Sequence, residues 1–169
     1  MFSTAGATTV RSSSCRAACS KRLTPRWRDF LAVAYSAPRA IVCCRSAASV
    51  HDLTDEIPNA VQIAVPRRSR PPKIDHPPTE VFRFDQSTFE LGLSGVLAAP
   101  RELVRIYDAP RTVVDLMRLR HRFGEPVAYG ALQRYLRRRD ARPAELLRLA
   151  EALDVFGPVR LALDVATAG

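Results

Sequence analysis

The sequence predicts an α+β domain: a small three- or four-stranded mixed sheet with flanking helices, followed by a C-terminal bundle of about four short helices. Two observations predict this order. Between residues 61 and 107, short apolar–polar alternations separated by proline-rich turns indicate strands. From residue 109 onward, apolar residues recur every three or four positions, which indicates amphipathic helices. Strands followed by a run of helices are typical of the α+β class.

The composition is that of a folded chain. Of the 169 residues, 47% are hydrophobic and 25% are charged, close to the averages for globular domains. No window approaches the roughly 18 consecutive apolar residues that a membrane-spanning helix requires. The four cysteines are too few and too clustered for a disulfide-stabilised scaffold. The length is sufficient for one ordinary domain with a tail.

The net charge of +9 is unevenly distributed along the chain. Residues 1–50 hold eight basic side chains and one acidic side chain, whereas residues 51–169 hold 18 basic and 16 acidic ones. Residues 1–24 are rich in Ser, Thr, Ala and Arg and contain no acid, a composition typical of disordered or transit segments. We therefore expect residues 1–35 to be disordered and residues 36–169 to form the domain.

Two helices and three strands are expected before residue 108. One helix starts at Trp27, and Pro38 fits the first turn of the second. Strands are predicted over residues 61–65, 81–84 and 103–107. Four prolines between the first two strands indicate a loop over residues 67–78, and the short segment from Phe89 to Leu93 stays ambiguous.

Four helices are expected after residue 108. In the first, Val113, Val114, Met117 and His121 share a stripe that ends at Gly124. The next helix has a wide apolar face between residues 127 and 136, the third begins at Pro143, and the last follows Gly157-Pro158. Brief connections between these helices favour a compact antiparallel bundle.

The most specific patterns lie in Ser46–Pro58 and Val104–Asp115. The first resembles the pattern SAL-x-x-H-x-LT…P, and the second reads as a strand, a turn with a proline, and a helix carrying an inward-facing acid. Both segments resemble the AbiEi family, the antitoxins of bacterial abortive-infection (phage defence) systems of type IV. The residues that carry the resemblance are Ser46, His51, Thr54, Pro58, Tyr107, Pro110, Thr112 and Asp115.

The resemblance implies an antitoxin that opposes a nucleotidyltransferase toxin, without being an enzyme and without forming a stable complex with the toxin. Such a protein is expected to be bacterial and cytoplasmic, with no cofactor and no membrane association. Full-length members also repress their own operon. A transcriptional regulator that binds operator DNA is therefore the alternative function, and an inactive truncated remnant is a further one.

The sequence also departs from the family pattern. The family has a large apolar residue at Ala48, an aromatic residue at Val50 and a glycine at Asp52. Members usually begin with a winged helix-turn-helix, and residues 1–35 contain no such pattern. We therefore expect residues 36–169 to correspond to the C-terminal antitoxin domain and residues 1–35 to be a segment foreign to the family.

Two clusters of basic side chains are candidates for contact with DNA, RNA or another polyanion. The proline-rich loop supplies Arg67, Arg68, Arg70 and Lys73, and one face of a predicted helix supplies Arg134, Arg137 and Arg138. Each cluster also has a simpler interpretation, as a solvated loop or as cations that complement a helix C-terminus. A location of both clusters on one side of the fold would favour binding.

The cysteines and histidines give no catalytic or metal-binding pattern. Cys43 and Cys44 are adjacent in a predicted helix, where neighbouring side chains point about 100° apart and are poorly placed to bind one ion. We expect them to be small buried hydrophobic residues. Ser46 and His51 are five positions apart and are not expected to pair. His51 is instead expected to hydrogen-bond a neighbouring backbone group or to cap a helix C-terminus.

Asp115 lies among apolar residues of its predicted helix. It is expected either to form a local salt bridge with Arg118, three positions away, or to accept hydrogen bonds that lock the junction between sheet and bundle. Neither role involves catalysis. The sequence thus predicts no enzyme, no metal site and no cofactor.

Overall fold

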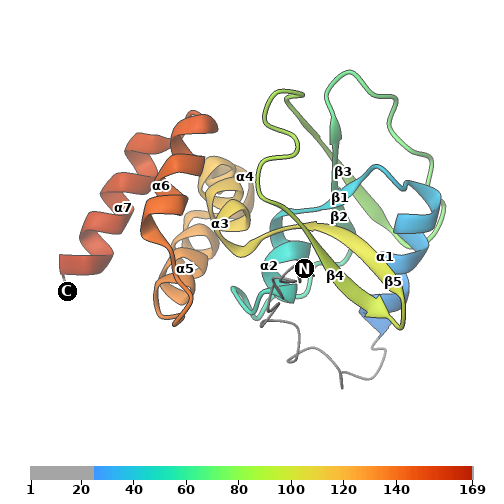
Figure 1. Ribbon diagram of the computed structural model, residues 1–169, viewed down its shortest axis with the longest axis horizontal. Coiled ribbons are helices and arrows are strands. Elements are labelled where there is room, and N and C mark those ends of the chain that lie inside the picture. The colour runs from blue at the N-terminus through green and yellow to red at the C-terminus, as the bar shows by residue number, and fades with distance from the viewer. Residues whose placement is uncertain (1–24, 169) are drawn as a thin grey trace, which may run out of the picture.

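A five-stranded mixed sheet with a helical bundle beside it makes up the computed structural model, which describes residues 25–168 (Figure 1). The strands are β1 (Ile41–Val42), β2 (Val61–Pro66), β3 (Thr79–Phe84), β4 (Leu93–Ala99) and β5 (Glu102–Tyr107). They lie in the order β3-β2-β1-β5-β4. The pairs β1–β5 and β2–β3 are parallel, and the pairs β1–β2 and β4–β5 are antiparallel. The predicted α+β class is confirmed.

The helices divide between the two faces of the sheet. They are α1 (Pro25–Ser36), α2 (Cys44–Val50), α3 (Ala109–Arg118), α4 (Arg120–Phe123), α5 (Glu125–Leu136), α6 (Pro143–Ala152) and α7 (Phe156–Ala168). On one face, Phe30 and Val33 of α1 pack against apolar side chains of β2 and β5. The opposite face shares a second, larger core with α3, α5 and α6. None of the helices within residues 25–168 is long and apolar enough to cross a membrane.

The sheet contains two strands that the sequence patterns did not predict. Ile41 and Val42 were expected in a helix, but they form β1 between β2 and β5 and are almost completely buried. Two residues are too few to show a period, so only pairing with neighbours on both sides defines this strand. Cys43 is consequently extended, and α2 begins at Cys44. The other strand, β4, begins at Leu93, the last residue of the ambiguous segment, and is held by pairing with β5.

The helical boundaries also differ from the expectation at three places. The stripe of α3 ends before His121, because the chain bends at Leu119, and His121 is exposed on the single turn of α4. Gly157 and Pro158 lie inside the first turn of α7. The expected disorder of residues 1–35 was wrong for residues 25–35, since α1 packs on the sheet with Phe30 and Val33 each 2% exposed. The prediction for residues 1–24 lies outside the described residues.

Helix α2 ends in a left-handed residue at Asp52, where φ is +58°. The N–H of Leu53 donates to the carbonyl oxygen of Ala48 (2.8 Å), and the Leu53 side chain is buried. This arrangement is a helix C-terminal motif in which glycine is favoured at the left-handed position. Asp52 is also the position at which the family pattern has glycine.

We expect the free energy of unfolding to follow the order Gly, Asp, Ala at position 52. Asp52→Gly should raise it by up to about 1 kcal/mol, because glycine adopts a positive φ without a steric cost at Cβ. Asp52→Ala should lower it, because alanine has no short polar side chain to ease this conformation. Urea unfolding of the three proteins at pH 7 measures the order. An alanine variant more stable than the glycine variant would contradict it.

Candidate functional site

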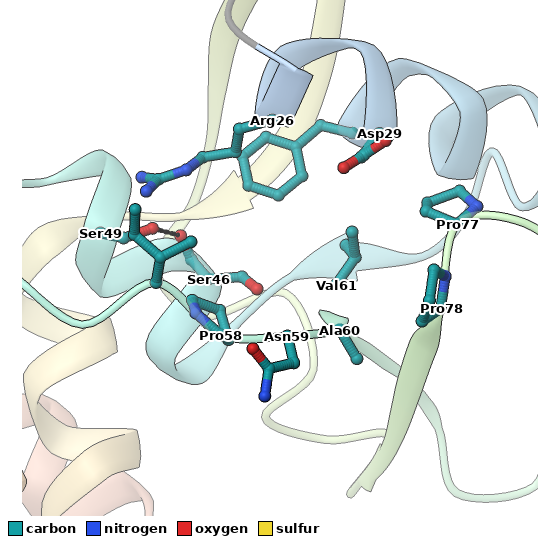
Figure 2. A pocket seen from close by; sticks show the side chains of 12 residues that line it. Arg26, Asp29, Ser46, Ser49, Pro58, Asn59, Ala60, Val61, Pro77 and Pro78 are labelled. Atoms are coloured by element: carbon teal, nitrogen blue, oxygen red, sulfur yellow. Dashed lines mark hydrogen bonds between the residues drawn. The ribbon is translucent and has the colours of Figure 1, made fainter.

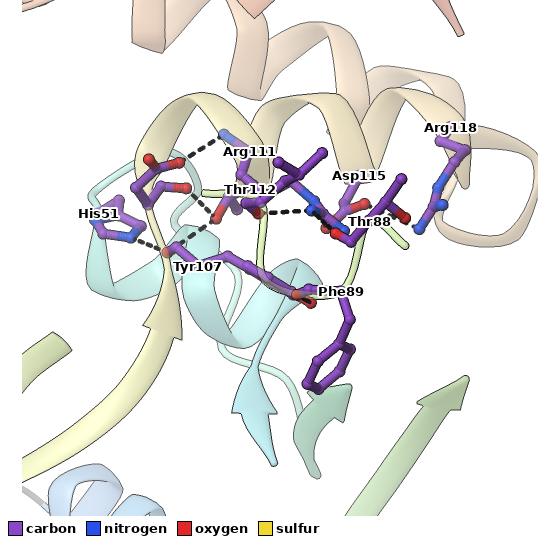
Figure 3. A network of polar contacts seen from close by, with 10 residues as sticks. His51, Thr88, Phe89, Tyr107, Arg111, Thr112, Asp115 and Arg118 are labelled. Atoms are coloured by element: carbon purple, nitrogen blue, oxygen red, sulfur yellow. Dashed lines mark hydrogen bonds and ion pairs between the residues drawn. The ribbon is translucent and has the colours of Figure 1, made fainter. Parts of the chain in front are cut away.

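Four of the residues that carry the family resemblance lie where β5 joins α3: His51, Tyr107, Thr112 and Asp115 (Figure 3). Nε2 of His51, at the end of α2, lies 2.7 Å from the carbonyl oxygen of Tyr107, although the two residues are 56 positions apart. The Tyr107 hydroxyl donates to the carbonyl oxygen of Phe89 (2.6 Å). Thr112 donates through Oγ1 to the carbonyl oxygen of Asp108 (2.7 Å). The junction therefore ties together α2, β5, α3 and the β3–β4 loop.

Local sequence explains why α3 begins at this point. The carboxylate of Asp108 accepts a hydrogen bond from the backbone N–H of Arg111 (2.9 Å) and so caps the helix. Pro110 lies in the first turn, where its missing N–H costs no helical hydrogen bond. Burial raises the pKa of Asp108, whereas the donated N–H of Arg111 opposes that rise. The start of α3 is thus set by two residues of the Val104–Asp115 segment.

A fully buried ion pair lies behind this junction. Nε of Arg111 donates to Oδ2 of Asp115 (3.0 Å), and both side chains are 0% exposed. Nη1 of Arg111 also donates to the carbonyl oxygens of Thr88 (2.8 Å) and Leu91 (2.6 Å). Arg118 donates through Nη2 to Oδ1 of Asp115 (2.9 Å). Burial raises the pKa of Asp115, and the two guanidinium groups act against that rise.

The predicted Asp115–Arg118 salt bridge is therefore present, and Asp115 also locks the junction through Arg111. The sequence patterns did not single out Arg111, because arginine side chains are rarely fully buried and an exposed position was the default expectation. The available signal was its position four residues before Asp115, a spacing that brings side chains together on a helix. The guanidinium carbon of Arg111 lies 4.3 Å from the ring centroid of Tyr107, so the aromatic face replaces part of its lost hydration.

His51 and the cysteines occupy structural positions. His51 occupies the C-cap position of α2, which was one of the two predicted roles. Its ring hydrogen-bonds the carbonyl oxygen of Tyr107, 56 positions away, and burial lowers its pKa. Cys43 and Cys44 are both 0% exposed, and burial raises the pKa of the Cys43 thiol. Within residues 25–168, no three or more His, Cys, Asp and Glu side chains are grouped so as to hold a metal ion.

The two predicted basic clusters do not form one surface. The β2–β3 loop and the C-terminal end of α5 lie at opposite ends of the molecule in Figure 1. The loop residues Arg67, Arg68, Arg70 and Lys73 are exposed. The cations of the second cluster are partly neutralised. Arg134 on α5 forms two hydrogen bonds with the Asp55 carboxylate, and Arg138, which follows the end of the helix, binds Asp140 (2.9 Å) and the His51 carbonyl (3.0 Å). Arg137 is exposed at the end of the helix.

A third group of arginines, which the sequence patterns did not single out, lies over aromatic rings beside the edge strand β3. From guanidinium carbon to ring centroid, Arg118 is 4.5 Å from Phe84, Arg122 is 4.4 Å from Phe82, and Arg45 is 5.3 Å from Phe123. Stacking orients the plane of each guanidinium group. Each of these stacked arginines also has an acidic partner, so the group carries little net charge.

A small cavity lies between α1, α2 and the start of β2 (Figure 2). Its volume is about 190 Å³, and its lining includes Arg26, Asp29, Ser46 and Pro58. Small-molecule sites usually measure roughly 300–1,000 Å³. The Ser46 hydroxyl is already engaged, since it accepts the backbone N–H of Gln62 (2.9 Å). The cavity is therefore a poor candidate for a ligand site.

Neither a family model nor a curated protein sequence matches the chain. The family resemblance therefore stays a hypothesis that rests on the residues themselves. In the first segment, Ser46 hydrogen-bonds β2 and His51 hydrogen-bonds β5. In the second segment, Tyr107 hydrogen-bonds the β3–β4 loop and Thr112 hydrogen-bonds Asp108 at the start of α3.

Proposed function

We propose that this chain carries the antitoxin domain of an AbiEi-type, type IV toxin–antitoxin system and opposes a nucleotidyltransferase toxin without catalysing a reaction. The observation that carries the proposal is the junction between β5 and α3. Two segments that are separate in the sequence and resemble one family are joined there by the His51–Tyr107 contact (Figure 3). The left-handed conformation of Asp52, at a position of glycine in the family, supports the same assignment.

Most side chains of the β5–α3 junction are buried and stabilise the fold. Contact with a partner molecule therefore requires exposed residues elsewhere on the domain. A nucleotidyltransferase acts on nucleotides, which are polyanions, and exposed arginines bind phosphate groups well. Arg67, Arg68 and Arg70 in the β2–β3 loop are exposed. At the C-terminal end of α5, by contrast, Arg134 and the following Arg138 already bind carboxylates of the protein. We therefore assign polyanion contact to the loop in preference to α5.

Growth rescue tests this function. An adjacent nucleotidyltransferase gene, if one exists, is induced in cells with and without the chain, and viable cells are counted. We expect the chain to restore viable counts. Absence of rescue by a soluble, folded chain would contradict the antitoxin assignment. Sequence-selective binding to an operator fragment, without rescue, would instead favour the transcriptional regulator.

Charge reversal distinguishes the two basic clusters. Arg67→Glu/Arg68→Glu is expected to reduce rescue by at least about tenfold, because each lost phosphate contact weakens polyanion binding. The matched control is Arg137→Glu/Arg139→Glu, which makes the same change of charge on exposed residues after α5. The control should rescue as well as the unmodified chain. Equal melting temperatures of both variants would separate loss of function from loss of folding, and the reverse result would assign the contact to α5.

A further inference from the structure

Helices α5 and α7 leave an apolar groove on the outer side of the bundle. The groove has a volume of about 530 Å³ and is lined by Tyr129, Leu132, Gln133, Leu161, Ala162, Val165 and Ala166. Leu161 and Val165 are 67% and 69% exposed. In Figure 1, α7 lies at the end of the molecule farthest from the sheet. Clustered exposed apolar side chains of this kind mark interaction surfaces.

The charges of α7 favour a second copy of the same helix as the occupant. Its only charged residues are Arg160 and Asp164, which are 54% and 57% exposed and paired at 3.0 Å. Residues 160 and 164 are placed symmetrically about Ala162. If a second α7 packs antiparallel across a two-fold axis near Ala162, Arg160 of each copy faces Asp164 of the other. The four charges then alternate in sign, whereas a parallel arrangement in register would place like charges together.

The shape of the groove agrees with this pairing. Leu161 and Val165 are one helical turn apart and project from the stripe adjacent to the charged pair. The small side chains of Ala162 and Ala166 line the groove and allow a second helix to approach closely. In a two-fold arrangement the same patch supplies both the projecting side chains and the groove that receives them.

We propose that the α5–α7 face is the interface of a two-fold symmetric homodimer. Leu161 and Val165 of each copy enter the groove of the other, and two Arg160–Asp164 ion pairs form between the copies. This interface does not depend on the antitoxin assignment, since it uses none of the residues of the β5–α3 junction or of the β2–β3 loop.

The first measurement is the molar mass of the full chain by sedimentation or light scattering over a range of concentrations. The chain of 18.7 kDa should approach twice that mass as concentration rises. Leu161→Glu should weaken dimerisation by at least about tenfold, because it would bury an unpaired carboxylate in the interface. The matched control is Leu103→Glu, because Leu103 is 66% exposed on β5, away from this face. The control should dimerise normally.

Charge exchange then tests the antiparallel pairing itself. Arg160→Asp gives a helix with two acids, and Asp164→Arg gives one with two bases, so each variant alone should be monomeric. An equimolar mixture should form heterodimers, and the double variant Arg160→Asp/Asp164→Arg should regain the homodimer. The double variant also rebuilds the local ion pair within α7. Recovery in the equimolar mixture is therefore the decisive result, because each chain there still lacks that local pair. A chain that is monomeric at every concentration, a dimer unaffected by Leu161→Glu, or a mixture that stays monomeric would each overturn the proposal.

Discussion

Replacement of Asp115 by Asn is expected to lower the free energy of unfolding by about 3–5 kcal/mol. The substitution keeps the shape of the side chain and removes its charge. Arg111, which is 0% exposed, would then be buried without a compensating carboxylate. Arginine cannot escape this cost by losing its proton, because a guanidinium group stays protonated in proteins. Domains of this kind have a free energy of unfolding of only about 5–15 kcal/mol, so the substitution would remove a large part of the stability.

Urea unfolding at pH 7 measures this loss, and two further variants make the result specific. Glu145→Gln removes an exposed i,i+3 pair with Arg148 and should cost less than about 1 kcal/mol. Arg111→Met/Asp115→Leu removes both buried charges and should be more stable than Asp115→Asn alone, because no unpaired charge remains. A cost below 1 kcal/mol for Asp115→Asn would show that the ion pair does not hold the junction.

Gly92→Ala is expected to lower the free energy of unfolding by about 2–5 kcal/mol, through strain and overlap together. Gly92 lies at the end of the β3–β4 loop with φ of +72°, which L side chains rarely adopt. A Cβ atom there would lie 2.4 Å from Cβ of Arg111 and 3.0 Å from its Cγ. Arg111 has little freedom to move away, because its guanidinium group binds Asp115 and two loop carbonyls.

The matched control is Gly130→Ala in α5, where an added Cβ meets no atom within 4 Å. That variant should gain about 0.5–1 kcal/mol, since alanine is the better helix former. Thermal unfolding of both variants gives the comparison. A Gly92→Ala protein as stable as Gly130→Ala would mean that the loop and Arg111 rearrange at low cost.

The sequence by itself determined the elements whose signal is local. The alternation in residues 61–65 and 103–107 predicted β2 and β5, and apolar residues at helical spacing predicted α5 and α6. The Asp115–Arg118 salt bridge was also predictable, because both residues lie on one turn of a helix. Such features depend on side chains within a few positions of one another, so their physical cause is contained in a short window of sequence.

Only the tertiary structure decided which distant residues meet. The two residues of β1 form a strand because β2 and β5 supply hydrogen bonds on both sides. Arg134 pairs with Asp55, 79 positions away, and this contact partly neutralises a residue that was predicted to bind polyanions. Arg111 is buried because Asp115 and the β3–β4 loop together replace its hydration. Burial and long-range pairing depend on the packing of whole elements, which no local period encodes.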